Sequence, residues 1–239
     1  MNEQHSRTEM LIGKEGLERL IESRVAIFGV GGVGGYAAEA LARAGVGQID
    51  LIDSDRVSLS NINRQIIATH DTVGMYKTEA MRQRILSINP EAKVTCYSVF
   101  FDESNKDSFD FSSYDYVVDA IDSLSAKIEL ICKAKESGTE IISAMGAGNK
   151  LDPTKFEVSD ISKTTVCPLA RAVRIALRKR GVNHLKVVYS KEPPVVVSES
   201  YGEKKRVPAS ISFVPSAMGL ILAGEVIKSI AFAEKTEEK

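Results

Sequence analysis

The sequence of 239 residues has no tryptophan and only three cysteines, Cys96, Cys132 and Cys167, which stand far apart in the chain. No two of them form a CxxC pair, and this absence excludes a zinc ribbon. An odd number of scattered cysteines is typical of a reducing compartment rather than of a disulfide-stapled secreted protein. We therefore expect a cytoplasmic protein.

A long apolar run and an apolar leader are also missing. The most apolar stretch, residues 217–224, is followed directly by Glu225 and then by Lys228. It is shorter than the roughly 20 apolar residues that a membrane span needs. The first residues are polar, unlike the core of a signal peptide. We expect no membrane partner, and we expect residues 217–224 to form a buried or interfacial helix.

The chain has no excess of charge of one sign, because 31 Lys and Arg face 32 Asp and Glu and the formal net charge is −1. This balance excludes a generally basic nucleic-acid binder and a generally disordered chain, but it says nothing about local patches. A chain of this length buries roughly 70% of its unfolded surface, so it needs no disulfide or structural metal to fold.

The first 150 residues alternate between short β-branched runs and longer helical patterns, which predicts crossover units around a parallel sheet. The expected strands are 24–30, 48–53, 93–100, 114–120 and 140–143. The expected helices are 36–44, 75–88 and 127–137. We predict an α/β, Rossmann-like fold with a mostly parallel sheet and helices on both faces.

After residue 150, the regular alternation of strand and helix patterns ends. Strands are expected at 155–161 and 185–190, around a helix at 169–180, and a loop at 193–208. With no repeat and no low-complexity linker, residues 1–239 are predicted to form a single domain, in which 151–239 is a mixed C-terminal elaboration of a core at about 5–150.

A glycine-rich motif follows the first expected strand and opens the next helix. Its glycines are Gly29, Gly31, Gly32 and Gly34. This GxGxxG spacing permits a tight turn and a close approach of backbone to phosphate, and the helix N-terminus attracts an anion. Asp53 ends the second strand, where a carboxylate accepts hydrogen bonds from ribose hydroxyls. The alternative is a plain glycine-rich turn, and the motif alone does not separate NAD from ATP.

Two cations in the sequence favour ATP over NAD as the ligand of this motif. Arg64 follows the second strand and Lys77 lies near the start of the next helix. The helix dipole disfavours a cation in the first turn of a helix, and a bound anion nearby offsets this cost. Together the two side chains can neutralise the β- and γ-phosphates, which a dinucleotide lacks. The alternative for each alone is a solvated surface charge.

Asp122 lies just beyond the carboxyl end of the fourth expected strand, where ligands bind in open α/β sheets. A carboxylate at this place can hold Mg²⁺ against phosphates. The alternative is an N-cap for the helix that follows, and the two roles can coexist.

In combination, these motifs resemble the ThiF-type, ubiquitin-activating-like adenylyltransferases. The matching stretches are 29–34, 53–55, 58–65, 74–77 and 119–122, and the resemblance covers about residues 5–150. It implies that Asp53 binds ribose, that Arg64 and Lys77 bind the triphosphate and that Asp122 binds magnesium. It also implies a homodimer in which Arg7 reaches the phosphates of the partner subunit. The nucleotide-binding residues implied are Gly29, Gly31, Gly32, Gly34, Asp53, Asp55, Asn61, Arg64, Gln65, Lys77 and Asp122.

Within that superfamily, members that activate a sulfur carrier usually bear two CxxC pairs, which this chain lacks. Residues 7–13, 119–123, 146–154 and 213–216 instead resemble the tRNA threonylcarbamoyladenosine dehydratases, over essentially the whole chain. This resemblance implies an ATP-dependent dehydration of threonylcarbamoyladenosine in tRNA to its cyclic form, through adenylation of its carboxylate. It does not identify a sulfur-transfer protein partner. The alternatives are a sulfur-carrier adenylyltransferase, a NAD-binding oxidoreductase and a non-catalytic nucleotide-sensing module.

Residues 161–191 contain no Asp or Glu but eight cations. Arg171, Arg174 and Arg178 recur on one face of the helix expected there, and with Lys163 they are our candidates for contacts to tRNA phosphates. The alternative is a solvated outer face. Cys167 precedes this helix close to cations, which can lower a thiol pKa and favour a nucleophile. The alternative is an ordinary thiol, because the substrate's own ureido group can close the ring.

Overall fold

A computed structural model describes residues 3–196 and 208–233. Most of the loop expected at 193–208 therefore lies outside the described residues. The described part forms one seven-stranded sheet with the strand order β3-β2-β1-β4-β5-β7-β6. The strands are β1 (Arg24–Phe28), β2 (Gln48–Ile52), β3 (Lys93–Tyr97), β4 (Tyr116–Asp119), β5 (Ile141–Ala144), β6 (Phe156–Asp160) and β7 (Lys186–Ser190).

Every neighbouring pair of strands is parallel except β6 and β7, which run antiparallel at one edge. The strand order reverses between β1 and β4, so the carboxyl ends of these two strands flank the crevice where ligands bind in such sheets. This arrangement confirms the predicted mostly parallel α/β fold. The antiparallel edge is formed by β6 and β7, which lie beyond residue 150, where the regular alternation of strand and helix patterns ends.

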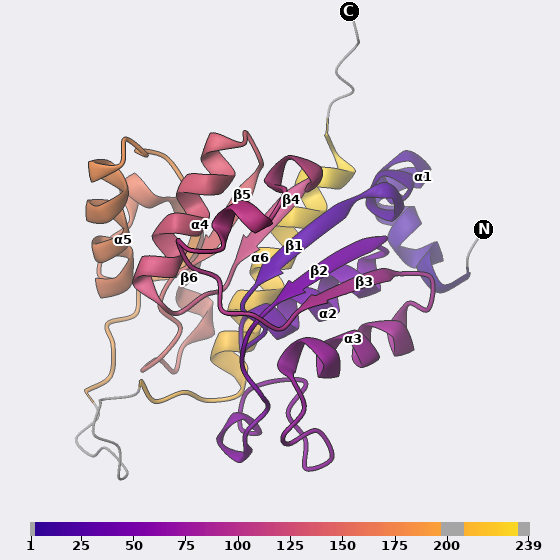
Figure 1. Cartoon of the computed structure of the whole chain (residues 1–239), viewed down its shortest axis with the longest axis horizontal. Helices are drawn as coiled ribbons and strands as arrows, with labels where there is room; N and C mark the ends of the chain where they lie inside the picture. The colour runs from indigo at the N-terminus through magenta and orange to yellow at the C-terminus, as the bar shows by residue number, and fades with distance from the viewer. Residues whose placement is uncertain (1–2, 197–207, 234–239) are drawn as a thin grey trace, which may run out of the picture.

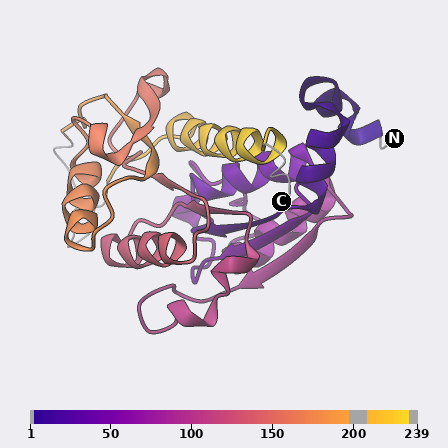
Figure 2. The same cartoon turned by 90° about the horizontal axis from the view of Figure 1, so that it is seen from above.

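Helices cover both faces of the sheet (Figure 1 and Figure 2). The first face packs against α2 (Gly34–Ala44), α3 (Lys77–Ile88) and α6 (Phe213–Ala231), whereas α4 (Leu124–Glu136) and α5 (Pro168–Lys179) lie on the other. Successive strand residues alternate between the two cores because side chains point to opposite faces. Ile27 therefore packs with α2 and α6, and Phe28 packs with the aromatic rings of the opposite face.

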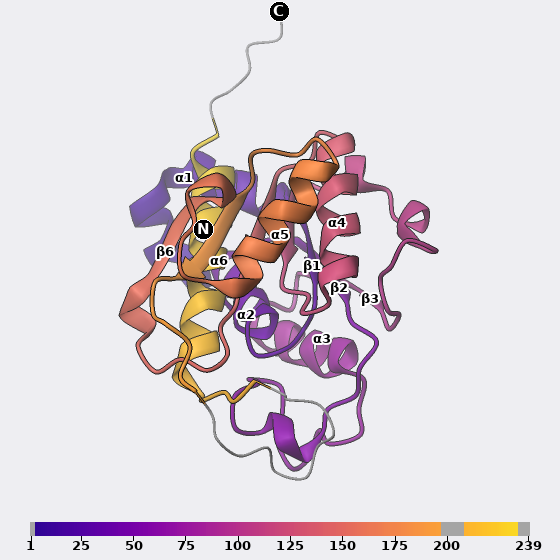
Figure 3. The same ribbon diagram turned by 90° about the vertical axis from the view of Figure 1, so that its left-hand side faces the viewer.

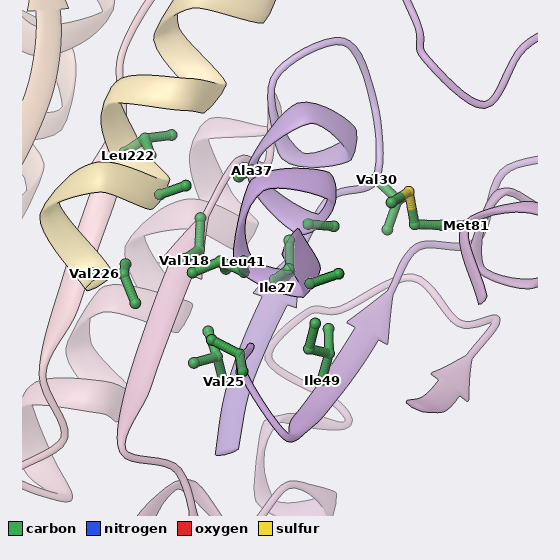
Figure 4. Packing of buried hydrophobic residues seen from close by; sticks show 14 of the residues in the cluster. Val25, Ile27, Val30, Ala37, Leu41, Ile49, Met81, Val118, Leu222 and Val226 are labelled. Atoms are coloured by element: carbon green, nitrogen blue, oxygen red, sulfur yellow. The ribbon is translucent and has the colours of Figure 1, made fainter. Parts of the chain in front are cut away.

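The core of the first face is built on α2 and α6. Figure 4 shows β-strand side chains such as Ile27, Ile49 and Val118 directed towards Leu41 of α2 and Leu222 of α6. Helix α6 is long and apolar enough to cross a membrane by length and composition. Yet Met218, Leu222 and Val226 are fully buried in this core, so these side chains serve packing, whereas Leu220 is 51% exposed. One face of this helix is therefore buried, and the interfacial alternative stays a prediction for the other face.

The helix α1 (Ser6–Glu22) was not among the expected elements. Its backbone leaves helical geometry at Gly13, which has a φ of 74°. The first half also exposes Met10 and Leu11, so it shows no apolar stripe that would have predicted a helix. The second half buries Leu20 against the sheet and ends where β1 begins.

The packing of α6 on α2 makes a testable prediction about two glycines of one helix. A Cβ at Gly219 would overlap the Val33 carbonyl oxygen and lie 3.0 Å from Tyr36 Cβ, whereas a Cβ at Gly224 would meet nothing within 4 Å. We expect Gly219→Ala to lower the free energy of unfolding by about 1–3 kcal/mol through overpacking.

Gly224→Ala is the matched control, and we expect it to be neutral or to stabilise by up to about 1 kcal/mol, because alanine is the better helix former. Urea denaturation of both variants measures the difference. Equal stabilities of the two variants would contradict the close packing of α2 and α6.

Candidate nucleotide and substrate site

The glycine-rich loop between β1 and α2 lies against the turn after β4. Gly29 has a φ of 91°, and a Cβ there would lie 2.5 Å from the Ala120 carbonyl oxygen. A Cβ at Gly34 would overlap the Gly29 carbonyl oxygen. Any larger residue at these two positions would push the loop away from the sheet. Helix α2 then starts without a side-chain cap, which leaves amide groups for an anion.

The carboxylate of Asp53 joins this loop to the end of β2. One oxygen accepts a hydrogen bond from Val30 N at 2.7 Å, and the other accepts from Asp55 N at 2.8 Å. Burial raises the pKa of the Asp53 carboxyl above its ordinary value, while the Lys77 ammonium and the two amides oppose this rise. The two amide hydrogen bonds hold the carboxylate at the carboxyl edge of the sheet, where a ribose is expected.

Arg64 and Gln65 lie against the glycine-rich loop, although they are far from it in the sequence. A Cβ at Gly32 would lie 3.4 Å from Arg64 Cγ, and a Cβ at Gly31 would lie 3.8 Å from Gln65 Nε2. Asn61 is buried and accepts from Ser58 N at 3.1 Å, which orders the turn that carries them. The Oε1 of Gln65 is buried without a hydrogen-bond partner among the described residues.

Lys77 is the first residue of α3, which begins two residues later than the expected start at 75, and its side chain is almost fully buried. Its Nζ lies 2.6 Å from Asp55 Oδ2 and 3.9 Å from Asp53 Oδ2. The ammonium is therefore paired with the two acids that follow β2, next to the loop that Asp53 holds. Lys77, Asp53 and Asp55 form one cluster at the site.

Asp122 is exposed in the turn between β4 and α4. Its carboxylate has no hydrogen-bond or ion-pair partner within residues 3–196 and 208–233, so it is available to a ligand. The alternative role as N-cap is wrong, because the N-cap of α4 is Ser123, which makes no side-chain cap bond.

Arg7 is not near the nucleotide site of its own chain. It is exposed in the first turn of α1, just after Gln4, which donates to the Ile88 carbonyl oxygen at the C-terminal end of α3 at 2.8 Å. That position is the amino edge of the sheet, opposite the glycine-rich loop. A contact between Arg7 and a nucleotide therefore requires a second subunit.

The basic run 161–191 divides into free and paired cations. Arg171 and Arg178 are exposed on α5, and neither has an ion-pair partner in the described part of the chain. Arg174 instead points to the preceding turn and donates to Thr164 Oγ1 at 2.6 Å. Other cations have acidic partners from elsewhere in the chain, namely Arg180 with Glu129, Lys186 with Glu225 and Lys191 with Glu157.

Lys163 is exposed at the end of the short 3-10 helix that precedes α5. Cys167 is only 3% exposed and packs in the core of the second face. A Cβ at Gly146 would lie 3.5 Å from its Sγ. The thiol is thus covered by the loop after β5.

A buried ion pair at this edge of the sheet escaped the sequence analysis. Lys127 and Asp119 are both fully buried, and their charged groups lie 2.8 Å apart. A usable signal existed, because Lys127 shares the apolar face of α4 with Leu130, Ile131 and Ala134 at helical spacing.

Comparisons with known proteins identify the family of this chain. A profile of the ThiF family matches residues 5–239. A tRNA threonylcarbamoyladenosine dehydratase of Bacillus subtilis is 45% identical over 96% of this chain and 95% of its own length. The crystal structure of the E. coli tRNA N6-threonylcarbamoyladenosine dehydratase with AMP superposes with a TM-score of 0.88 at 35% identity, covering 95% of this chain and 93% of that chain.

The E. coli enzyme in complex with ATP superposes with a TM-score of 0.87 at 34% identity, again over 95% of this chain and 93% of that one. The family profile and both superpositions extend over nearly the whole chain. The chain belongs to the ThiF family.

Proposed function

We propose that this protein is an ATP-dependent tRNA threonylcarbamoyladenosine dehydratase. The observation that carries the proposal is the convergence of Asp53, Arg64, Lys77 and the Asp122 turn on one glycine-rich loop. The nearly full-length similarity to the Bacillus subtilis dehydratase supports the same reaction. Its cofactor is ATP, its substrate is tRNA that carries threonylcarbamoyladenosine, and its location is the cytoplasm.

In the first step, the substrate carboxylate attacks the α-phosphorus of ATP. The new oxygen–phosphorus bond gives an acyl-adenylate, and the bond to pyrophosphate breaks. Arg64 and Lys77 stabilise the charge on the departing pyrophosphate, Asp53 orients the ribose, and the amides of the glycine-rich loop hold the phosphates. Positioning and electrostatics supply most of such a transfer.

Asp122 fits a magnesium site, because its exposed carboxylate is free of partners in the described ranges and stands at the carboxyl edge of β4. Magnesium is usually held by one or two carboxylates together with substrate phosphates, so a single carboxylate is enough on the protein side. The described residues contain no cluster of three acidic, His or Cys groups that could hold a metal without a substrate. When bound, Mg²⁺ neutralises phosphate charge.

In the second step, a nitrogen or oxygen of the substrate's own ureido group attacks the activated carbonyl carbon, the bond from that carbon to the AMP oxygen breaks, and the ureido group loses one proton as AMP leaves. The ring closes, and the net change is the loss of water. No protein nucleophile is needed, which agrees with the burial of Cys167. Residues 5–150 supply the nucleotide site in this scheme, and 151–239 supply the substrate-binding and dimerisation elaboration.

The sulfur-carrier alternative is disfavoured because the chain has no CxxC pair for the zinc of those relatives. Pyrophosphate exchange stimulated by a carrier protein ending in Gly-Gly would restore it. An oxidoreductase would leave Arg64, Lys77 and Asp122 without a role, and tighter binding of NAD than of MgATP would favour that function.

The proposed function is tested by mass analysis of tRNA nucleosides after incubation with the protein and ATP. We expect cyclic threonylcarbamoyladenosine with one AMP and one pyrophosphate per nucleoside converted. Asp122→Ala should slow conversion by about 10²-fold or more, the order found when a charge-stabilising group is removed.

Lys133→Ala is the control for this measurement, because Lys133 is remote from the site on α4 and pairs with Asp107. It should convert at the wild-type rate. Pyrophosphate released equally with and without modified tRNA, or AMP without a cyclic nucleoside, would contradict the assignment.

The free cations of α5 are proposed to bind tRNA phosphates. Both Arg171 and Arg178 are exposed, and the helix that carries them, α5, lies beside α4 (Figure 3). Arg171→Gln/Arg178→Gln should weaken tRNA binding and make the slope of log K against log salt shallower by roughly 1–2, because each phosphate contact releases counterions.

Arg180→Gln is the matched control, because the Arg180 guanidinium is bound to Glu129 and, with Lys106, lowers the pKa of that carboxyl to about 2. It should leave the salt slope nearly unchanged. The same loss in both variants, measured by filter binding over a salt series, would contradict a specific role of the free cations.

We also propose a homodimer in which Arg7 acts on the phosphates bound by the partner. Met10 and Leu11 stand beside Arg7 on α1, and each is 84% exposed. Neighbouring exposed apolar side chains are typical of a protein contact surface. A second copy would cover them and bring Arg7 to a nucleotide site.

Arg7 acting in trans predicts complementation between two inactive proteins. Equal amounts of Arg7→Ala and Asp122→Ala, allowed to exchange subunits, should recover about a quarter of the wild-type rate, because half of the dimers are mixed and each has one complete site. Lys14→Ala, an exposed change on the same helix, should be fully active alone. A mixture that stays inactive although light scattering shows exchanged dimers would contradict this role.

A further inference from the structure

The ammonium of Lys127 is completely buried at the carboxyl edge of the sheet. Its Nζ donates to Asp119 Oδ2 at 2.8 Å, to the Ala144 carbonyl oxygen at 3.0 Å and to Ser143 Oγ at 3.4 Å. These three acceptors use all three N–H groups of the ammonium. The side chain therefore ties α4 to the ends of both β4 and β5.

The carboxylate of Asp119 is shared between this network and the turn after β4. Ser143 Oγ donates to its Oδ2, and Ile121 N donates to its Oδ1 at 3.1 Å. Asp119 lies between Phe28 of β1 and Ser143 of β5 in the sheet register. The carboxylate thus fixes the backbone one residue before Asp122.

The same turn is pressed against the glycine-rich loop. Ala120 N donates to the Phe28 carbonyl oxygen at 2.8 Å, and the Ala120 carbonyl faces Gly29. A shift of the turn would therefore move both Asp122 and the loop that receives the phosphates. Residues 119–123 have little freedom as long as Asp119 is held.

Stability alone does not account for a lysine at this place. A buried ion pair is often no more stabilising than apolar side chains of similar volume, because both charges lose their hydration. Lys127 also lies near the start of α4, where the helix dipole disfavours a cation. Apolar side chains at both positions 119 and 127 would fill the same volume without either cost, so the charged pair requires another explanation.

We propose that Lys127 is a positioning residue for ATP binding: through Asp119 it holds the β4–α4 turn in the conformation that presents Asp122 to the metal and phosphates. The proposal rests on the proposed function only in its use of MgATP. Lys127 itself touches no substrate. It acts through the Asp119 carboxylate and the Ile121 amide.

Lys127→Met tests the proposal with two measurements that need neither tRNA nor turnover. Calorimetric titration with MgATP should show affinity weakened about 10-fold or more, which corresponds to a lost charge-assisted contact. Hydrogen exchange followed by mass spectrometry should show faster exchange in the peptide that contains Ile121. An unchanged affinity together with unchanged exchange there would overturn the proposal.

Two controls separate positioning from a general loss of stability. Lys133→Met makes the same change on the same helix at a surface pair and should alter neither measurement. Val226→Ala creates a cavity in the opposite core, far from the turn. It should lower the melting temperature and keep the MgATP affinity, and an equal loss of affinity in this variant would overturn the proposal.

Ser143→Ala provides a milder change if Lys127→Met does not fold. It removes one donor to the Asp119 carboxylate and leaves the ion pair in place, so MgATP affinity should fall and exchange at Ile121 should rise by about 2–5-fold, the order of one lost hydrogen bond. Wild-type MgATP affinity and wild-type exchange at Ile121 in this variant would contradict the positioning role. Binding results of either kind stand apart from the nucleoside analysis, so the two proposals fail separately.

Discussion

The close approach of two backbone segments at the centre of the sheet governs the rest of this structure. Gly29 leaves β1 against the carbonyl of Ala120, and no side chain fits between them. The strand order reverses at this point, so the loops after β1 and β4 face the same crevice. Because α2 and the Asp122 turn both start from this contact, the positions of helix amides and carboxylate relative to each other depend on it.

Charge in this protein is organised by pairing across distant segments. Asp53 and Asp55 come from one loop and pair with Lys77 of the next helix. Asp119 and Lys127 form a fully buried ion pair next to the turn between β4 and α4. The near-zero net charge is thus compatible with an acidic cluster at the nucleotide site and with unpaired arginines on α5. Pairing decides which charges remain available to a ligand, and Arg171 and Arg178 are available where Arg180 is not.

Much of the fold and of the site was predictable because the signals are local. Alternating apolar residues marked the strands, and glycine spacing with Asp53 marked the loop that the structure places at the switch point. Helix α1 escaped prediction because Gly13 interrupts it and its exposed Met10 and Leu11 break the periodicity. The N-cap interpretation of Asp122 failed by one residue, since the start of α4 depends on how the turn is held.

Local patterns in the chain were enough to predict the class of fold, the glycine-rich loop and the motif residues, because hydrophobic period and turn chemistry act over a few residues. Which charges are buried, paired or free depends on the tertiary structure. Tertiary packing joined Lys127 to Asp119, turned Arg174 towards Thr164 and placed the start of α1, with Arg7, beside the C-terminal end of α3. Partners separated by many residues meet only when the sheet order and the helix packing are in place, and no local pattern encodes those distances.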